Sequence, residues 1–156
     1  LLIATAEAHD EEMRQRIARH QSDRAARVPR MQTLEEPRDL ARVLVQRGAP
    51  DTLIVVDCLT LWLTHWMFGS DENLIQKEAP AHDWTAQAAL FFEALAKTPG
   101  PVVLVGNEIG LGVIPLGSQV RAFVDALGVL NQQAAQACAG ATLMVSGLPL
   151  TLKDTP

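Results

Sequence analysis

The sequence has 156 residues, of which 48% are hydrophobic and 20% are charged, and its formal net charge is −5 at pH 7. This length and composition are typical of one globular domain with a sizeable core, and the negative charge argues against a general nucleic-acid-binding protein, which needs a basic face. No apolar run approaches the roughly 20 residues of a membrane-spanning helix, and no signal-peptide pattern opens the chain, so we expect a cytoplasmic protein without a membrane span.

The first segments of the chain predict a strand followed by a basic helix. Leu1–Thr5 is apolar and favours a strand. A helix is predicted from Asp10, a favourable N-cap, because Met13 and Ile17 recur at four-residue spacing. Residues four apart share one face of a helix, and three polar residues of this helix do so: Arg16, His20 and Arg24.

A basic loop and a second helix come next. Arg27–Gln32 is irregular and contains a proline, so it is predicted to be a loop. Thr33–Pro37 is interpreted as the end of this loop. Pro37 is expected at the first position of a helix that continues through Val45, because proline is well tolerated there.

The apolar run Thr52–Val56 leads into the carboxylate of Asp57. A continuous apolar run of this kind predicts a strand that is buried on both faces of a parallel sheet. Asp57 would then lie at the carboxyl end of the strand, which is the edge where open α/β sheets bind ligands. An acid at that edge commonly holds the Mg²⁺ of a nucleotide, although it could also simply cap the next helix.

The rest of the chain continues to alternate helices and strands. The predicted segments are a helix over Leu59–Phe68, a helix over Trp84–Lys97, a buried strand over Val102–Val105, a glycine-dense loop over Gly106–Pro115, a helix over Val120–Ala139, a strand over Leu143–Gly147 and an edge strand over Pro149–Lys153. This order predicts a three-layer α/β fold with a mostly parallel sheet flanked by helices, in a single domain over residues 1–156. Cys58 and Cys138 lie far apart and are interpreted as small core residues.

Three polar groups are expected at the ligand edge of the sheet: the helix face with His20, the acid Asp57, and the loop residues Asn107 and Glu108. Together they suit phosphoryl or nucleotidyl transfer, which needs a carboxylate for Mg²⁺ and cationic donors for phosphate oxygens. A neutral imidazole between two arginines is also a credible nucleophile toward phosphorus. Each group has a structural explanation as well, since arginine-rich faces are usually solvated and such loops usually only turn the chain.

A series of motifs in this chain resembles one enzyme family. The motifs are Ile3–Ala6, Asp10–Met13, Arg16–His20, Thr33–Pro37, Val56–Trp62, Asn107–Pro115 and Leu130–Gln132. They are similar to those of the bifunctional adenosylcobinamide kinase / adenosylcobinamide-phosphate guanylyltransferase enzymes of cobalamin biosynthesis. The resemblance runs from Leu1 to about Lys153, and Asn107–Pro115 is its most specific part.

The resemblance implies a P-loop NTPase fold of the RecA-like type and a homo-oligomer, for which a trimer is one candidate. It implies two reactions: phosphorylation of adenosylcobinamide, and transfer of GMP from GTP to adenosylcobinamide phosphate through a guanylylated histidine, which gives adenosylcobinamide-GDP. The implied cofactors are Mg²⁺ and GTP, with ATP or GTP as the phosphoryl donor. The implied partners are these small molecules, with no nucleic acid.

The resemblance also implies roles for individual residues. By its position in the Arg-Ile-x-x-His motif, His20 would be the guanylylated residue, and Asp57 would contact Mg²⁺. The residues implied to lie around the nucleotide are Ala4, Thr5, Ala6, Gln21, Ser22, Asp23, Arg24, Glu35 and Asp57. Asn107 and Glu108 match the family's motif and are expected in a substrate or active-site loop.

The phosphate-binding motif of P-loop enzymes is not among these residues. The sequence contains neither GxxxxGK[ST] nor GxGxxG, and we expect the P-loop, with its strand and helix, to precede Leu1 in the natural protein. Two alternatives to the bifunctional enzyme follow. One is a relative that binds nucleotide or forms oligomers without efficient catalysis, and the other is a different P-loop small-molecule kinase in which His20 is incidental.

Overall fold

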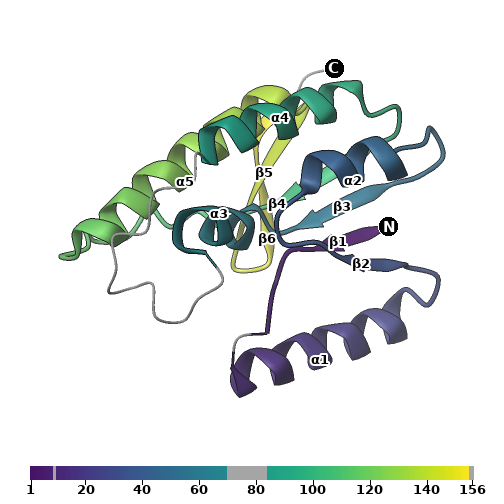
Figure 1. Cartoon of the computed structure of the whole chain (residues 1–156), viewed down its shortest axis with the longest axis horizontal. Helices are drawn as coiled ribbons and strands as arrows, with labels where there is room; N and C mark the ends of the chain where they lie inside the picture. Colours follow the sequence, from purple (N-terminus) through teal and green to yellow (C-terminus); the bar gives the residue numbers. More distant parts are fainter. Residues whose placement is uncertain (9, 70–83, 155–156) are drawn as a thin grey trace. The chain divides into compact units, whose positions relative to one another are not determined.

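The computed structural model describes residues 1–8, 10–69 and 84–154 of the chain (Figure 1). They fall into two compact units, Leu1–Asn107 and Glu108–Pro156. That the whole chain forms a single domain therefore stays a prediction.

The first unit is built on a four-stranded parallel sheet. Its strands are β1 (Leu2–Ala4), β2 (Thr33–Glu35), β3 (Ile54–Asp57) and β4 (Val102–Val105), in the order β2-β1-β3-β4. Parallel neighbours need crossover connections, and helices provide them here. The predicted α/β class, with a mostly parallel sheet, is confirmed.

Three helices of this unit pack together over the sheet: α2 (Leu40–Arg47), α3 (Leu59–Phe68) and α4 (Trp84–Lys97). Helix α4 contacts both α2 and α3. The rings of Trp62 on α3 and Phe91 on α4 lie 5.6 Å apart, and both side chains are almost wholly buried. The largest fully buried side chains of the unit come from these helices and from β1 and β3: Trp62, Phe91, Ile3, Leu40, Leu44, Ile54, Leu59, Leu63, Val43 and Val56.

The expectation that β3 and β4 are buried on both faces is wrong for the residues described. Burial alternates along β3, where Ile54 and Val56 are buried and Asp57 is exposed. In β4, Val103 and Val105 are 48% and 39% exposed. An apolar run does not indicate whether one or both faces of a strand are covered, because strands buried on one face and strands buried on both faces are rich in the same β-branched residues.

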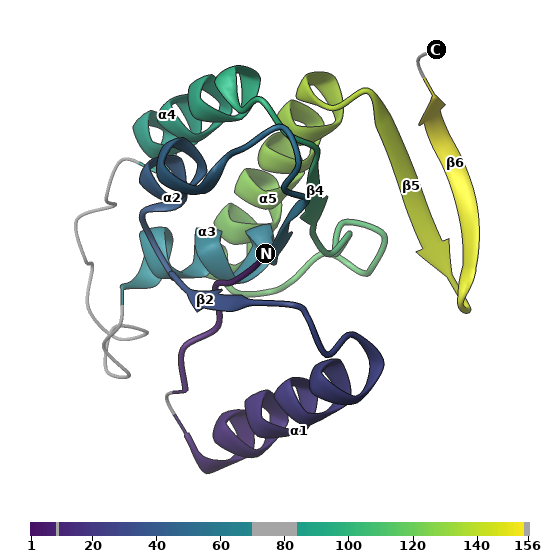
Figure 2. The same ribbon diagram turned by 90° about the vertical axis from the view of Figure 1, so that its right-hand side faces the viewer.

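Helix α1 (Glu11–Arg27) has no buried residue. The side chain of Asp10 accepts a hydrogen bond from the amide of Met13, so the predicted N-cap is confirmed. In both views α1 lies on the side of β1 and β2 that faces away from α2 and α4 (Figure 2). The helix is thus joined to the sheet mainly through the segments at its two ends.

Two sequence expectations for the segment before α2 are wrong. Thr33–Glu35 is strand β2 and pairs with β1, rather than ending a loop. Helix α2 begins at Leu40, with Asp39 as N-cap accepting from the amide of Arg42, so Pro37 is not its first residue. A three-residue strand is recognised only through its partner, because so short a segment has no periodicity of its own.

The second unit contains α5 (Ser118–Ala137) and a hairpin of β5 (Gly140–Val145) and β6 (Leu148–Asp154). The hairpin is antiparallel and forms its own two-stranded sheet. Ser146 and Gly147, at φ of 53° and 77°, form its turn, as two-residue hairpin turns require. The predicted elements are present, with β5 starting at Gly140 instead of Leu143 and α5 at Ser118 instead of Val120.

Both cysteines are free, but only Cys58 is buried. Cys138 follows the end of α5 and is partly exposed, so its interpretation as a core residue is wrong. Among the described residues, no helix is both long and apolar enough to cross a membrane.

Candidate nucleotide site

Three of the predicted nucleotide-binding residues form a row across the carboxyl edge of the sheet. Ala4 ends β1 and pairs with Glu35 of β2 on one side and with Asp57 of β3 on the other. Side chains paired in register point to the same face of a sheet. The register therefore brings the carboxylates of Glu35 and Asp57, which are separated in the sequence by helix α2, to the same face of the sheet at its carboxyl edge.

Asp57 is the last residue of β3, and its side chain is exposed. Its backbone carbonyl accepts a hydrogen bond from the amide of Thr5. Within the described part of the chain, the carboxylate itself takes part in no hydrogen bond or ion pair. It is thus available to a ligand at the sheet edge.

Thr5 is wholly buried and fixes the start of the turn after β1. Its hydroxyl donates to the carbonyl of Cys58 and accepts from the amide of Cys58, each at 2.8 Å. The Thr5 side chain is therefore occupied within the protein. A hydrogen bond from the segment Ala4–Ala6 to a ligand would therefore come from backbone groups, and among the described residues the backbone of Ala6 has no hydrogen-bond partner.

Two residues at this edge were missed by the sequence analysis: Glu7 and His65. His65 lies on α3 and is only 4% exposed. Its Nε2 is 2.8 Å from the carbonyl oxygen of Thr5, and its Nδ1 is 3.2 Å from Oε2 of Glu7. The available signal was a titratable residue in an otherwise apolar helix, which indicates a polar partner nearby.

The end of β4 is joined to the start of α3. The amide of Asn107 donates to the hydroxyl of Thr60 at 2.9 Å, and Thr60 lies in the first turn of α3. This bond places Asn107 beside the helix that follows Asp57. Its location at the carboxyl edge is as the sequence indicated.

His20 lies near the middle of α1 and is exposed, as are Ser22, Asp23 and Gln21. The helix is regular from Glu11 to Arg27, so Arg16, His20 and Arg24 share one face, as the spacing predicts. Gln21 donates from Nε2 to Oε1 of Glu35 at 3.3 Å, which links α1 to the row at the sheet edge. No hydrogen bond joins His20 to another described residue.

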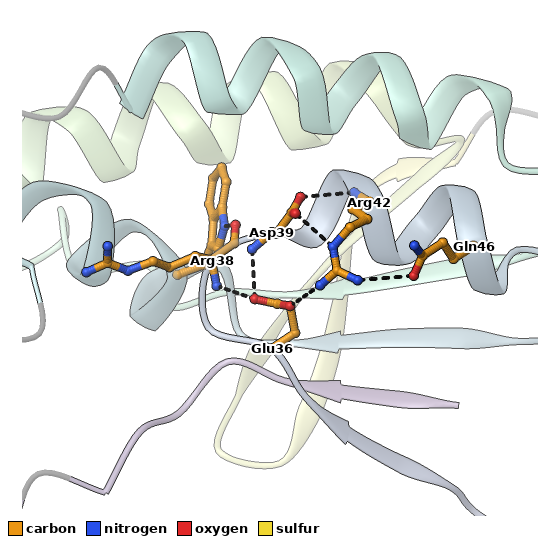
Figure 3. A network of polar contacts seen from close by, with 6 residues as sticks. Glu36, Arg38, Asp39, Arg42 and Gln46 are labelled. Atoms are coloured by element: carbon orange, nitrogen blue, oxygen red, sulfur yellow. Dashed lines mark hydrogen bonds and ion pairs between the residues drawn. The ribbon is translucent and has the colours of Figure 1, made fainter.

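The turn after Glu35 is held by a polar network around Glu36 (Figure 3). Glu36 Oε1 accepts from the amides of Arg38 and Asp39 at 3.1 and 2.9 Å, and Oε2 accepts from Arg42 at 2.7 Å. Arg42 also donates to Asp39, and this hydrogen bond raises the pKa of the guanidinium above its ordinary value. The network fixes the connection between β2 and α2, and with it the position of Glu35.

Glu108 belongs to the second unit. Its Oε1 accepts from the amide of Gly110 at 3.0 Å, and its Oε2 accepts from Nδ2 of Asn131 on α5 at 3.3 Å. At the other end of the same loop, Arg121 donates to the carbonyl of Pro115 at 3.0 Å. Glu108 therefore holds the loop Gly110–Pro115 against α5, and within its own unit that is its observed role.

The donor set at the sheet edge fits one hard divalent cation bound together with phosphate. In the described residues, no three His, Cys, Asp or Glu side chains converge as a complete metal site. Mg²⁺ in nucleotide sites, however, is commonly held by one or two carboxylates, with phosphate oxygens and water as its other ligands. The exposed carboxylate of Asp57 meets that requirement.

A cavity of about 450 Å³ lies at the opposite edge of the sheet. It is lined by residues that precede the strands, among them Leu1, Gln32, Thr52 and Leu53. Ligands of open α/β sheets bind at the carboxyl ends of the strands. We therefore assign the candidate site to the row of Glu35, Ala4 and Asp57 rather than to this cavity.

Residues 1–152 match the family described as cobinamide kinase / cobinamide phosphate guanyltransferase. The chain is 43% identical over 154 residues to the bifunctional adenosylcobalamin biosynthesis protein CobP of Pseudomonas aeruginosa, covering 99% of this chain and 82% of that protein. It is 32% identical over 157 residues to the bifunctional adenosylcobalamin biosynthesis protein CobU of Salmonella typhimurium, and the match covers 98% of this chain and 85% of that protein. CobU of Escherichia coli is 31% identical over the same span.

Proposed function

The chain belongs to the cobinamide kinase / cobinamide phosphate guanyltransferase family, and we propose which of its residues take part in the two reactions. The enzyme phosphorylates adenosylcobinamide and then transfers GMP from GTP to the new phosphate, which gives adenosylcobinamide-GDP. ATP or GTP serves as the phosphoryl donor in the first reaction. Of the two, the guanylyl transfer is the one that the residues of this chain support in most detail.

In the guanylyl transfer, His20 is the nucleophile. A ring nitrogen of neutral His20 attacks the α-phosphorus of GTP, the bond from that phosphorus to the bridging oxygen breaks, and pyrophosphate leaves with the electron pair. A phosphate oxygen of adenosylcobinamide phosphate then attacks the same phosphorus, the P–N bond breaks, and the imidazole is regenerated. Covalent catalysis divides one difficult displacement into two easier ones.

The observation that carries this proposal is the face of α1 that presents His20 between Arg16 and Arg24. Two guanidinium groups lie one turn away on either side of this ring. Their positive charges attract the triphosphate of GTP and so offset its repulsion by the carboxylates at the sheet edge. Arg24 Nε is buried and has no hydrogen-bond partner among the described residues, so it is a donor left unsatisfied by the protein itself.

The nucleotide is proposed to lie along the row formed by Glu35, Ala4 and Asp57, with the backbone of Ala6 beside it. Gln21–Arg24 of α1 approach it from the other side, and the bond from Gln21 to Glu35 supports that arrangement. Asp57 would hold Mg²⁺, which when bound neutralises phosphate charge and favours displacement at phosphorus. Asn107 and Glu108 are proposed to border the substrate, with no separate chemical role assigned to either.

The test is a labelling experiment with GTP carrying ³²P at the α-position. The wild-type chain with Mg²⁺ should form an acid-labile GMP adduct, and His20→Ala should form none. His82→Ala serves as the control, since it removes a different histidine and should leave the labelling intact. Undiminished labelling of His20→Ala would overturn the assignment of the nucleophile.

The same experiment separates the two alternatives. A different small-molecule kinase would hydrolyse or transfer the γ-phosphate without forming a GMP adduct. A relative that has lost catalysis would bind GTP but show neither reaction. Either result in the wild-type protein would contradict the bifunctional assignment.

The enzyme is further proposed to be a cytoplasmic homo-oligomer, with a trimer as one candidate. Strand β6 supports an interface, because Leu148, Leu150 and Leu152 are each more than half exposed, and contiguous exposed apolar residues usually mark a contact surface. Light scattering after size-exclusion chromatography tests this. A monomer at micromolar concentration would contradict it.

A further inference from the structure

His65 is a buried histidine that the proposed chemistry does not use. Its Nε2 lies 2.8 Å from the carbonyl oxygen of Thr5, which can only accept a hydrogen bond, so Nε2 carries the proton and donates. Its Nδ1 lies 3.2 Å from the carboxylate of Glu7. The Glu7 contact is an ion pair only when Nδ1 is protonated as well, so the contact that holds the ring in either case is the one with the backbone of the segment that follows β1.

The Thr5 carbonyl is covalently linked to the amide of Ala6. The two groups belong to one planar peptide unit, and in the trans form they point in opposite directions. A hydrogen bond that fixes the direction of the Thr5 carbonyl therefore also fixes the direction of the Ala6 N–H. Since Ala6 has no backbone partner among the described residues, this N–H is available to a ligand.

The other bonds of Thr5 hold the residue but leave this peptide free to rotate. The amide of Thr5 donates to Asp57, and its hydroxyl is bonded to the backbone of Cys58. These contacts fix the atoms on the amino side of the Thr5 α-carbon and its side chain. Of the contacts made by Thr5, the bond from His65 is the one that acts on its carbonyl.

We propose that His65 is a positioning residue for nucleotide binding: its hydrogen bond to the Thr5 carbonyl aims the amide of Ala6 at an oxygen of the bound nucleotide. Glu7, whose Oε2 lies 3.2 Å from Nδ1, adds an ion pair to this orientation when both ring nitrogens are protonated. This rests on the proposed function, in which Ala4–Ala6 border the nucleotide. It adds a specific donor, the Ala6 N–H, and the group that orients it.

The first test compares two substitutions in the wild-type background. His65→Leu keeps an apolar volume and removes the donor, so KM for GTP in the labelling reaction should rise about tenfold, the typical effect of losing an aligned hydrogen bond. His65→Gln restores an N–H donor and should return KM to within about threefold of wild type. The rate at saturating GTP should change little in both.

A matched control comes from the neighbouring residue. Thr64→Ala removes the bond from the Thr64 hydroxyl to the carbonyl of Thr60, which lies within α3 and does not touch Thr5. It should leave KM for GTP unchanged. If His65→Leu and His65→Gln lower thermal stability and the saturated rate alike, with KM unchanged, His65 is merely structural and the proposal is overturned.

A second measurement decides the matter even if His65→Leu does not fold. The protein is labelled with ¹⁵N-alanine, and the Ala6 amide is assigned by its absence in Ala6→Gly. Addition of GTP and Mg²⁺ should shift the Ala6 amide in the wild-type protein, and less so in His65→Leu. If the Ala6 amide does not respond while the GMP adduct still forms, this inference is overturned and the proposed function stands. If the wild-type protein forms no adduct, the proposed function itself is contradicted.

Discussion

Thr5 and Cys58 exchange two hydrogen bonds across the ends of neighbouring strands, through the Thr5 hydroxyl and the backbone of Cys58, each 2.8 Å long. This bond pair locks the turn after β1 to the turn after β3. It explains why a polar side chain is wholly buried at this position. The candidate site is therefore built on a rigid junction, in which Asp57 and Ala6 flank the bonded pair.

Thr5→Val should destabilise the protein strongly. Valine has nearly the same shape but leaves the amide of Cys58 without a partner in a buried place, while the carbonyl of Cys58 still accepts from the amide of Trp62, which should cost roughly 1–3 kcal/mol. Thr5→Ser keeps the hydroxyl and loses one methyl group, so its cost should be about 1 kcal/mol. Urea midpoints followed by circular dichroism measure the difference, and equal midpoints for the two variants would contradict the role of the hydroxyl.

Arg16→Gln and Arg24→Gln should each reduce guanylylation by about tenfold or more, because a charge-assisted bond to phosphate is lost. Arg14→Gln is the matched control on the same helix. Arg14 pairs with Glu11 in an exposed ion pair, so its loss should change stability by about 0.5 kcal/mol or less and leave labelling intact. An equal loss of activity in all three variants would indicate that general basicity of α1 matters rather than one face.

Cys138 should react slowly with iodoacetamide at pH 8. Burial raises the pKa of its thiol above the ordinary value, while the charge of Lys153 opposes that shift. A higher pKa leaves less thiolate at a given pH, so the rate should keep rising with pH beyond the point where a free thiol levels off. Modification is followed by mass spectrometry of the Cys138 peptide, since Cys58 is only 8% exposed.

Lys153→Met provides the comparison for that experiment. Removing the positive charge should raise the pKa of Cys138 further and slow the reaction at pH 8, whereas Lys153→Arg should not. Lys153 Nζ also donates to the carbonyls of Ala135, Gln136 and Cys138 at the end of α5. Faster alkylation in Lys153→Met would mean that these bonds, rather than the charge, control access to the thiol.

Gly100→Ala and Gly128→Ala should have effects of opposite sign. A β-carbon at Gly100 would lie 2.0 Å from the carbonyl oxygen of Ala49 and 2.7 Å from that of Thr52, so the loop must shift at a cost of about 1–3 kcal/mol. At Gly128, inside α5, a β-carbon would meet nothing within 4 Å. There alanine should stabilise the helix by about 1 kcal/mol. Thermal melting of both variants tests the pair, and stabilisation by Gly100→Ala would contradict the described packing.

Local patterns determined much of the secondary structure from the sequence. Trp84–Lys97 and Val102–Val105 were predicted with the bounds that the structure shows, because continuous helical and β-branched patterns are local properties. Strand β2 was not predicted, since three residues carry no period and their pairing with β1 depends on a partner about 30 residues away. The single-domain prediction is one that the structure leaves open.

For the site, the sequence by itself determined which polar residues lie at the ends of the strands: Asp57 as the last residue of β3 and Asn107 shortly after β4. Only the tertiary structure decided that Glu35, Ala4 and Asp57 share one row, because register is set by the packing of distant segments. The same holds for His65, which meets Thr5 across 60 positions of sequence. The spacing of residues along the chain cannot indicate such a contact, because it forms only when the folded chain brings α3 to the segment that follows β1.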